Sequence, residues 1–220
     1  LLGEIIRRLS GQELDAFLEA RLFRPLGMHE TGFNPIGAPA EDAGGADALK
    51  AAGATLLERI APTEIDTVFR HTHVHGMVHD ENAYAMGGVA PHAGLFSSAR
   101  DLAIFSQMML NGGFYGEVRL LEPATVRHFT RRQSAASSRA LGWDTPSARS
   151  SAGDYFSAAS FGHTGFTGTS LWIDPTQDLF VVLLTNRVNP TRDNSAHVAL
   201  RRAVHDAVQQ SIVDTPAGRR

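Results

Sequence analysis

The chain of 220 residues is long enough for one domain, or a large part of one, and for a substantial buried core. A hydrophobic content of 43% with 20% charged residues is typical of globular proteins, and no apolar run approaches transmembrane length. The net charge of −3 gives no electrostatic reason to expect nucleic acid as a partner, and the lack of cysteine excludes disulfides, thiol catalysis and Cys-ligated zinc.

The first 27 residues predict two helices. Apolar residues recur with helical spacing from Leu1 to Leu9, which indicates the tail of an amphipathic helix. Residues 10–13, Ser-Gly-Gln-Glu, match a capping box and predict a second helix, which Pro25 and Gly27 would end. Its buried stripe would consist of Leu14, Phe17, Leu18 and Leu22.

The middle of the chain predicts an irregular segment and two further helices. Residues 28–56 are rich in Gly, Ala, Pro and Asp, and we expect a long surface excursion with a short helix around residues 46–52. Ser98 is placed to cap a helix, and Pro123 suits the first turn of another. The inward side chains of the first would be Leu102, Phe105, Met108 and Met109, and the second carries Val126 and Phe129.

The last third predicts strands followed by a helix. A short strand at 140–143 would interrupt a polar loop, and two longer strands are expected at 160–173 and 179–185, with a turn at 174–178. A final amphipathic helix is expected at 195–213, with Val204, Val208 and Ile212 facing inward. Helices, then antiparallel strands, then a last helix predict an α+β fold.

A cluster of histidines raises the hypothesis of a metal site. His71, His73, His75 and His79 lie within nine residues, with Asp80 adjacent, and alternate histidines on a strand are able to ligate zinc. However, no His-Glu-x-x-His pair occurs, and the spacing fits no common zinc pattern. We therefore expect exposed polar side chains here, and no bound metal.

Two other hypotheses have less support. A self-contained Ser-His-Asp hydrolase would be expected to carry a Gly-x-Ser-x-Gly elbow, and the sequence has none. A non-enzymatic interaction domain has no positive signal in the sequence, but nothing in the sequence excludes it.

One tripeptide suggests a ligand site. His163, Thr164 and Gly165 stand near the start of the first long predicted strand. A histidine beside a hydroxyl, followed by a residue without a side chain, is poorly suited to core packing. The same group suits a strand at which a ligand comes close to the backbone.

Four separated segments resemble the serine β-lactamase and penicillin-binding-protein superfamily, in particular its β-lactamase-related serine hydrolases. They follow in the family's order across almost the whole chain: LLGEIIRRLSGQELDAFLEARLFRPLGMHETGF, APTEIDTVFR, GMVHDENAYAMGGVAPHAGLFSSARDLAIFSQMMLNGG and FGHTGFTGTSLWIDP. The resemblance implies the C-terminal part of an α+β fold in which helices flank an antiparallel sheet. Residues 1–130 would supply mostly helical lobe and loops, and residues 131–220 sheet strands and the C-terminal helix.

The resemblance also implies roles for the tripeptide. The family's third motif, Lys-Thr-Gly or His-x-Gly, matches His163, Thr164 and Gly165 residue by residue. Thr164 would offer its hydroxyl to substrate, Gly165 would leave room for it, and the Phe166 N–H would donate one oxyanion-hole hydrogen bond. Histidine is only partly charged near neutral pH, which favours an esterase or peptidase over an enzyme that binds a β-lactam carboxylate.

Two motifs of the family are missing from the sequence. Its chemistry needs Ser-x-x-Lys, yet Lys50 is the only lysine and Asp47 stands three residues before it. No Tyr or Ser has Asn two positions later, as the second motif requires. We therefore expect the C-terminal portion of a longer serine hydrolase that is inactive alone. The alternative is a catalytically incompetent partial homologue with a binding or scaffolding role.

The expected partners follow from this interpretation. They are a small-molecule or peptide substrate and the missing N-terminal part of the same fold, with no cofactor. A β-lactam, a peptidoglycan peptide and a simple ester all remain open as substrates. Relatives often act outside the cytoplasm on cell-wall material, so the resemblance favours a periplasmic or extracellular location.

Overall fold

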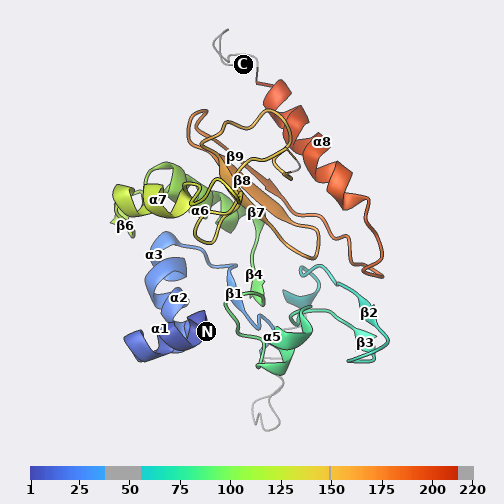
Figure 1. Ribbon diagram of the computed structural model, residues 1–220. Helices are drawn as coiled ribbons and strands as arrows, with labels where there is room; N and C mark the ends of the chain where they lie inside the picture. The colour runs from blue at the N-terminus through green and yellow to red at the C-terminus, as the bar shows by residue number, and fades with distance from the viewer. Residues whose placement is uncertain (38–55, 149, 213–220) are drawn as a thin grey trace. The chain divides into compact units, whose positions relative to one another are not determined.

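The computed structural model describes residues 1–37, 56–148 and 150–212 (Figure 1). The chain forms two compact units, one of Leu1–Asp101 with Val188–Asp193 and the other of Leu102–Arg187 with Asn194–Arg220. Both contain helices and antiparallel strands, as the expected α+β class requires. The short helix expected around residues 46–52 lies outside the described residues. None of the helices in the described ranges has the length and apolar character needed to cross a bilayer.

The first unit is built from short helices and two-stranded antiparallel pairs. The strands β1 and β4 form one pair, and β2 and β3 the other. The elements are α1 (Leu2–Ser10), α2 (Leu14–Leu18), a π-helical turn (Glu19–Phe23), α3 (Arg24–Leu26), β1 (Gly32–Phe33), β2 (Ile65–Asp66), β3 (Thr72–His73), α5 (Glu81–Ala85), β4 (Leu95–Phe96) and the start of α6 (Ala99–Leu110).

The capping box expected at residues 10–13 is wrong. Ser10 instead ends α1, where its hydroxyl donates to the Ile6 carbonyl at 2.7 Å. Gly11 adopts a φ of 71°, and its N–H donates to the Arg7 carbonyl, which is the usual left-handed helix end. The residue that precedes α2 is Glu13, whose side chain makes no capping bond.

The buried stripe of the second helix also differs from the prediction. Leu14 is buried as expected, but Phe17, Leu18 and Leu22 are only half-buried, and Phe23 is buried instead. The π-helical turn explains the change, because its wider turn shifts the inward position by one residue. A regular helical period therefore gives the wrong residue beyond this point.

The N-terminus of α6 is anchored as expected and by one further contact. The Ser98 hydroxyl accepts a bond from the Asp101 N–H at 3.3 Å, in agreement with the predicted cap. The buried Asp101 carboxylate accepts from the Glu30 N–H and the Thr31 hydroxyl, each at 2.8 Å. This carboxylate therefore fixes the chain before β1 to the start of α6.

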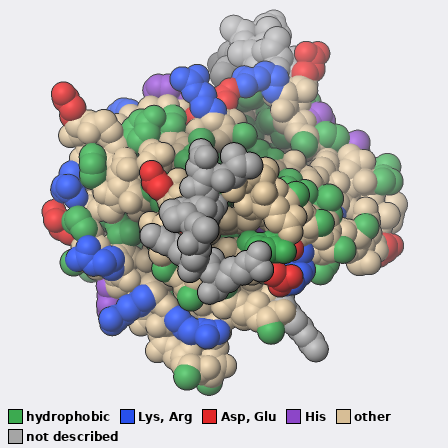
Figure 2. All heavy atoms as spheres, turned by 90° about the horizontal axis from the view of Figure 1, so that it is seen from above, with side chains coloured by type: hydrophobic (Ala, Val, Ile, Leu, Met, Phe, Trp, Pro, Cys, Tyr) green, Lys and Arg blue, Asp and Glu red, His purple; other side chains and the backbone are tan. Residues whose placement is uncertain are grey.

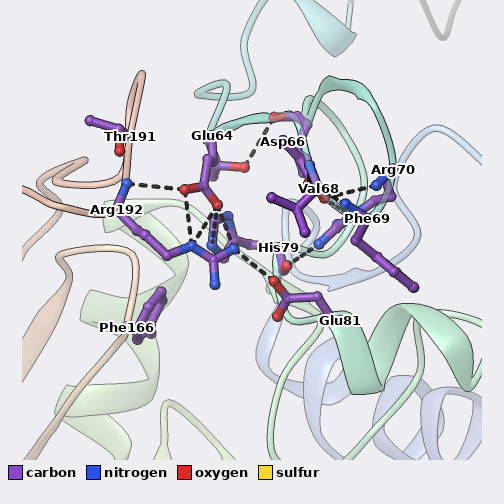
Figure 3. A network of polar contacts seen from close by, with 12 residues as sticks. Glu64, Asp66, Val68, Phe69, Arg70, His79, Glu81, Phe166, Thr191 and Arg192 are labelled. Carbon is purple, nitrogen blue, oxygen red and sulfur yellow. Dashed lines mark hydrogen bonds and ion pairs between the residues drawn. The ribbon is translucent and has the colours of Figure 1, made fainter.

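A polar network ties residues 188–193 to the rest of the first unit (Figure 3). Arg192 Nε donates to both carboxylate oxygens of the buried Glu64, at 2.9 and 2.7 Å, and Nη2 donates to Glu81 at 2.6 Å. These bonds hold the pKa of Glu64 and that of Glu81 below their ordinary values. Close by, Asp66 accepts bonds from the N–H groups of residues 68–70 and from Arg70 Nε.

The second unit contains a three-stranded antiparallel sheet in the order β7-β8-β9. The helix α8 runs beside this sheet (Figure 1). The elements of the second unit are the rest of α6, β5 (Phe114–Tyr115), β6 (Val118–Arg119), α7 (Pro123–Thr130), β7 (Phe161–Thr164), β8 (Ser170–Asp174), β9 (Leu179–Leu183) and α8 (His197–Gln210). Pro123 lies in the first turn of α7, as predicted.

The first long strand of the prediction, 160–173, is in fact two strands. β7 and β8 pair with Thr164 opposite Ser170, so residues 165–169 form the turn between them. Gly168 allows this turn with a φ of 125°, and a Cβ there would lie 2.7 Å from the Thr185 carbonyl oxygen. Two of the five residues in this turn are glycines, Gly165 and Gly168, and the predicted single strand ran through both of them.

The short strand expected at 140–143 does not form. The Ala140 N–H donates to the Trp143 carbonyl at 2.9 Å, which makes a tight turn instead. Asp144, just after it, exchanges two main-chain hydrogen bonds with Gly162 of β7, at 2.7 and 2.9 Å. The pairing with β7 therefore exists, but it is a single bridge.

The predicted inward face of α8 is wrong as well. Val204, Val208 and Ile212 are only half-buried. The buried row consists of Arg201, His205 and Gln209. His205 Nδ1 donates to the Ser151 carbonyl at 2.7 Å, and its ring lies edge-on to Phe156, so a polar partner compensates for burial of this imidazole.

The face drawn in Figure 2 shows how the small net charge is distributed. Basic and acidic side chains are both spread over that face, so no single sign of charge covers it. This surface offers no electrostatic argument for a nucleic-acid partner.

Removing Arg192 should destabilise the first unit. Arg192→Ala leaves the buried Glu64 carboxylate without its guanidinium, and we expect a loss of about 1–2 kcal/mol in the free energy of unfolding. Arg59→Ala, which breaks the exposed ion pair with Glu30, is the control and should have a much smaller effect. Urea titrations measure both, and equal losses would contradict this account of the network.

His205 should make stability depend on pH. Burial lowers the pKa of His205 below its ordinary value near 6.5. The unfolded chain therefore binds the proton more tightly, so stability is retained above about pH 7 and lost as the pH falls below about 6.5. We expect His205→Gln to flatten the dependence of the unfolding free energy on pH between 7 and 5. His128→Gln on the exposed face of α7 serves as the control, and an equal slope in all three proteins would contradict the prediction.

Candidate functional site

His163, Thr164 and Gly165 lie where β7 ends and the turn to β8 begins. The preceding Phe161 and Gly162 are buried, whereas His163 is exposed and Thr164 and Gly165 are half-buried. A Cβ added to Gly162 would lie 2.4 Å from the Trp172 ring, so close packing holds the base of β7 against β8. The tripeptide is thus carried to the surface by a rigid, well-packed strand.

The hydrogen bonds of His163 define its tautomer. Arg139 Nη1 lies 3.1 Å from His163 Nε2, and His163 Nδ1 lies 2.9 Å from the Thr164 carbonyl oxygen. A guanidinium only donates, so Nε2 accepts. The proton of the neutral ring is then on Nδ1, which donates to the carbonyl. The imidazole in this geometry is an uncharged acceptor.

Arg139 is a site residue that the sequence analysis missed. It precedes the tight turn at 140–143 and forms a bridge with Asp144, which in turn bridges to Gly162. These two bridges place its guanidinium beside His163, so a permanent positive charge lies at the motif although histidine replaces lysine. Because the bridge from Asp144 to Gly162 joins residues far apart in sequence, no local pattern reveals this neighbour.

The turn after Thr164 is held by its own backbone. The Gly165 N–H donates to the Thr169 carbonyl at 2.8 Å, and the Gly168 N–H donates to the Gly165 carbonyl at 3.2 Å. A Cβ on Gly165 would lie 2.2 Å from the Thr169 hydroxyl. A side chain at position 165 would therefore require the Thr169 hydroxyl to move, and the expected role of Gly165 in leaving room for substrate stays a prediction.

Two arginines outside the turn bind its carbonyl oxygens. Arg187 Nε donates to the Phe166 carbonyl at 2.7 Å, its N–H donates to the Thr167 carbonyl at 2.8 Å, and its guanidinium lies 4.2 Å from the exposed Phe166 ring. Arg201 of α8 donates to the carbonyls of residues 165, 168 and 169. Both residues were absent from the sequence-based site, because only the fold brings them to the turn.

The histidine cluster is dispersed in the first unit. His73 is exposed on β3, while His75 Nε2 contacts the Ile60 carbonyl at 2.7 Å. His79 is buried 3.7 Å from Glu64, and Asp80 caps α5 by accepting from the Ala83 N–H at 2.8 Å. Within the described ranges, no group of three or more His, Cys, Asp or Glu side chains is arranged to hold a metal ion.

One buried Ser–His pair bears on the Ser-His-Asp hypothesis. Ser170 Oγ lies 3.5 Å from His205 Nε2, and both residues are buried in the second unit. The other ring nitrogen of His205 binds the main-chain carbonyl of Ser151 rather than a carboxylate. This pair therefore lacks the third member of a triad and has no access for a substrate.

Comparison with known proteins gives a family match over nearly the whole chain. The model of the Beta-lactamase family matches residues 1–206. A protein of Escherichia coli K12 named "Putative D-alanyl-D-alanine carboxypeptidase" is 38% identical over 201 residues, which cover 85% of this chain and 43% of that protein. A protein of the same name from Salmonella newport is 39% identical with the same coverage. The chain thus spans less than half the length of these relatives.

Solved structures agree on the fold. A β-lactamase from Mycobacterium bovis is 21% identical with a TM-score of 0.59, and the match covers 95% of this chain and 60% of that one. A penicillin-binding-protein homologue from Caulobacter crescentus is 19% identical with a TM-score of 0.58, covering 93% and 55%. At these identities the likeness concerns the fold alone.

The tautomer of His163 is directly testable in this chain. We expect nitrogen-15 NMR at neutral pH to show the proton on Nδ1, because Arg139 occupies Nε2 as a donor. Arg139→Met removes the donor and should bring the Nε2-protonated form into the spectrum. His128, exposed on α7, is the internal control. An Nε2-protonated His163 in the unsubstituted chain would contradict the assigned contact.

Proposed function

The chain belongs to the β-lactamase family, and we propose that it is the C-terminal part of a serine hydrolase that cleaves D-alanyl-D-alanine peptides through an acyl-enzyme. The observation that carries the proposal is the 38% identity, across 85% of the chain, to relatives named for that carboxypeptidase activity. The motif at the end of β7 supports the same conclusion, since it matches the family's third motif residue by residue.

Each residue of the tripeptide takes a role in this proposal. The Thr164 hydroxyl contacts substrate, Gly165 lets substrate lie along the strand, and the Phe166 N–H donates to the oxyanion of the tetrahedral intermediate. Such a donor contributes about 3–4 kcal/mol to transition-state stabilisation. The attacking serine, its lysine base and the second oxyanion donor would come from the N-terminal part of the same fold.

Arg139 restores positive charge beside the motif. Histidine in place of lysine by itself predicts a loss of positive charge there. The neutral His163 instead holds a guanidinium beside it, and a guanidinium binds carboxylates with charge-assisted hydrogen bonds. A peptide ending in a free D-alanine carboxylate therefore remains a suitable substrate. Substrates of this kind belong to the cell wall, which supports the proposal of a periplasmic or extracellular site of action.

The sheet supports the proposal of a missing part. β9 lies at an edge of the three-stranded sheet, and all five of its residues, Leu-Phe-Val-Val-Leu, are apolar and half-buried. An apolar edge strand usually pairs with another strand in the native protein. The N-terminal part of the fold would supply this partner together with the Ser-x-x-Lys and Tyr-x-Asn motifs.

The experiment begins with the reading frame upstream of Leu1. If it encodes both motifs, the longer protein should release D-alanine from a D-alanyl-D-alanine peptide, and its Ser→Ala variant at Ser-x-x-Lys should not. We expect the 220-residue chain alone to stay at the buffer blank, because loss of the nucleophile costs about 10⁶-fold in a comparable enzyme.

Three results would count against the proposal. An upstream frame without the motifs would favour the partial homologue with a binding or scaffolding role. A longer protein that carries both motifs but releases no D-alanine would refute the substrate class. A covalent adduct of an acylating probe on any serine of this chain, found by mass spectrometry, would refute the assignment of the nucleophile to the missing part.

A further inference from the structure

We propose that Arg201 is a positioning residue that strengthens the Phe166 N–H as a hydrogen-bond donor. The inference rests on the proposed function, in which that N–H stabilises the oxyanion. It adds a residue of the C-terminal helix to the machinery of the site, although the Arg201 side chain itself does not contact the substrate.

The contacts of Arg201 carry the inference. Its Nη2 donates to the Gly165 carbonyl at 2.7 Å and to the Thr169 carbonyl at 2.8 Å, and Nε donates to the Gly168 carbonyl at 3.2 Å. Arg201 is 7% exposed, so these bonds are made largely out of water. The charge of a buried guanidinium is thus stabilised by main-chain carbonyl dipoles.

The position of the first of these bonds is decisive. The Gly165 C=O and the Phe166 N–H belong to the same planar peptide group. In a trans peptide the C=O and the N–H point in opposite directions. The guanidinium, the peptide group and the oxyanion would therefore form a chain in that order. A hydrogen bond to the carbonyl polarises the peptide and makes its N–H a stronger donor, and the low local dielectric increases the effect.

A second guanidinium holds the next peptide group. Arg187 Nε donates to the Phe166 carbonyl, and the Arg187 N–H donates to the Thr167 carbonyl. With Arg187 on one side and Arg201 on the other, the carbonyls of residues 165–169 all have donors. The Phe166 amide is therefore held in a fixed orientation before any substrate binds, which is the preorganisation that oxyanion stabilisation requires.

A purely structural role for Arg201 makes a different prediction. If its only task were to dock α8 on the sheet, its loss would lower stability and any effect on activity would follow the folded fraction. If it polarises the peptide, its loss should lower kcat while KM stays nearly constant, because the oxyanion exists only in the transition state.

The kinetic test uses the longer protein and three variants. Arg201→Gln removes the charge, Arg201→Lys retains it, and Arg202→Gln is the matched control. Arg202 is the next residue of α8 and also binds a main-chain carbonyl, that of Ser150, and a carboxylate, that of Asp154, away from the turn. Loss of a complete oxyanion donor lowers kcat by about 100- to 1,000-fold, so weakening one by Arg201→Gln should lower it by about 5- to 30-fold. Lys should recover most of this loss, and Arg202→Gln should stay within about 2-fold of the unsubstituted protein.

A spectroscopic test uses the 220-residue chain and does not depend on catalysis. We expect the Phe166 amide nitrogen to resonate upfield in Arg201→Gln, to return toward its original position in Arg201→Lys, and to be unmoved in Arg202→Gln. If the longer protein shows no hydrolysis at all, the proposed function fails and this shift alone decides the inference.

Three outcomes would overturn the inference. One is an unchanged kcat in a folded Arg201→Gln protein. Another is a Phe166 resonance that responds equally to substitution of Arg201 and Arg202. A fall in kcat that Lys does not restore, at equal folded fraction, would likewise assign Arg201 a purely steric role.

Discussion

The hydrogen bonds to the carbonyls of the turn between β7 and β8 join this turn to two later segments of the second unit, those of Arg187 and Arg201. A five-residue turn bonds only some of its own carbonyls, and an unpaired buried carbonyl costs free energy comparable to a lost hydrogen bond. Arg201 and Arg187 supply the missing donors from segments that follow the sheet in sequence. The need for donors at this turn explains why α8 buries an arginine where an apolar helix face was expected.

The same principle operates in the first unit with carboxylates in place of carbonyls. Glu64 and Asp101 are both buried, and each accepts hydrogen bonds from a segment distant in sequence, Glu64 from Arg192 and Asp101 from Glu30 and Thr31. Such groups contribute to a unique structure mainly because leaving any one of them unpaired is expensive. The short strands and helices of this unit have little regular hydrogen bonding of their own. The hydrogen bonds of these buried side chains therefore fix much of the arrangement of its segments.

The sequence predicted those parts of the fold that local patterns control. Three such features depend only on residues close in sequence, and the structure has all three: the cap at Ser98, the start of α7 at Pro123 and the turn after Asp174. The family resemblance, carried by whole segments, was likewise confirmed by the family match over residues 1–206. Prediction failed where tertiary contacts override the local pattern.

The failures share a physical cause. Hydrophobic periodicity assigns valines to the inside of α8, but the buried row is Arg201, His205 and Gln209, and the hydrogen-bond partners of Arg201 and His205 lie in distant segments. The predicted strand at residues 160–173 is interrupted by a turn in which the backbone of Gly168 lies close to Thr185, a contact that arises only in the folded sheet. At the site, the tripeptide was visible in sequence, whereas Arg139 was not, since the two bridges that bring it to His163 have no sequence signature.

The polar face of α8 also limits how the protein can vary. An apolar helix face tolerates small shifts along the sheet, because dispersion contacts are not directional. A shift of one residue rotates a helical position by about 100°, which would carry Arg201 away from all three carbonyls. The loop before His197 must therefore accommodate any insertion or deletion between β9 and α8, so that the residues of α8 keep their positions relative to the sheet. Among relatives, length differences should collect in that connection, while the spacing from Arg201 to His205 stays constant.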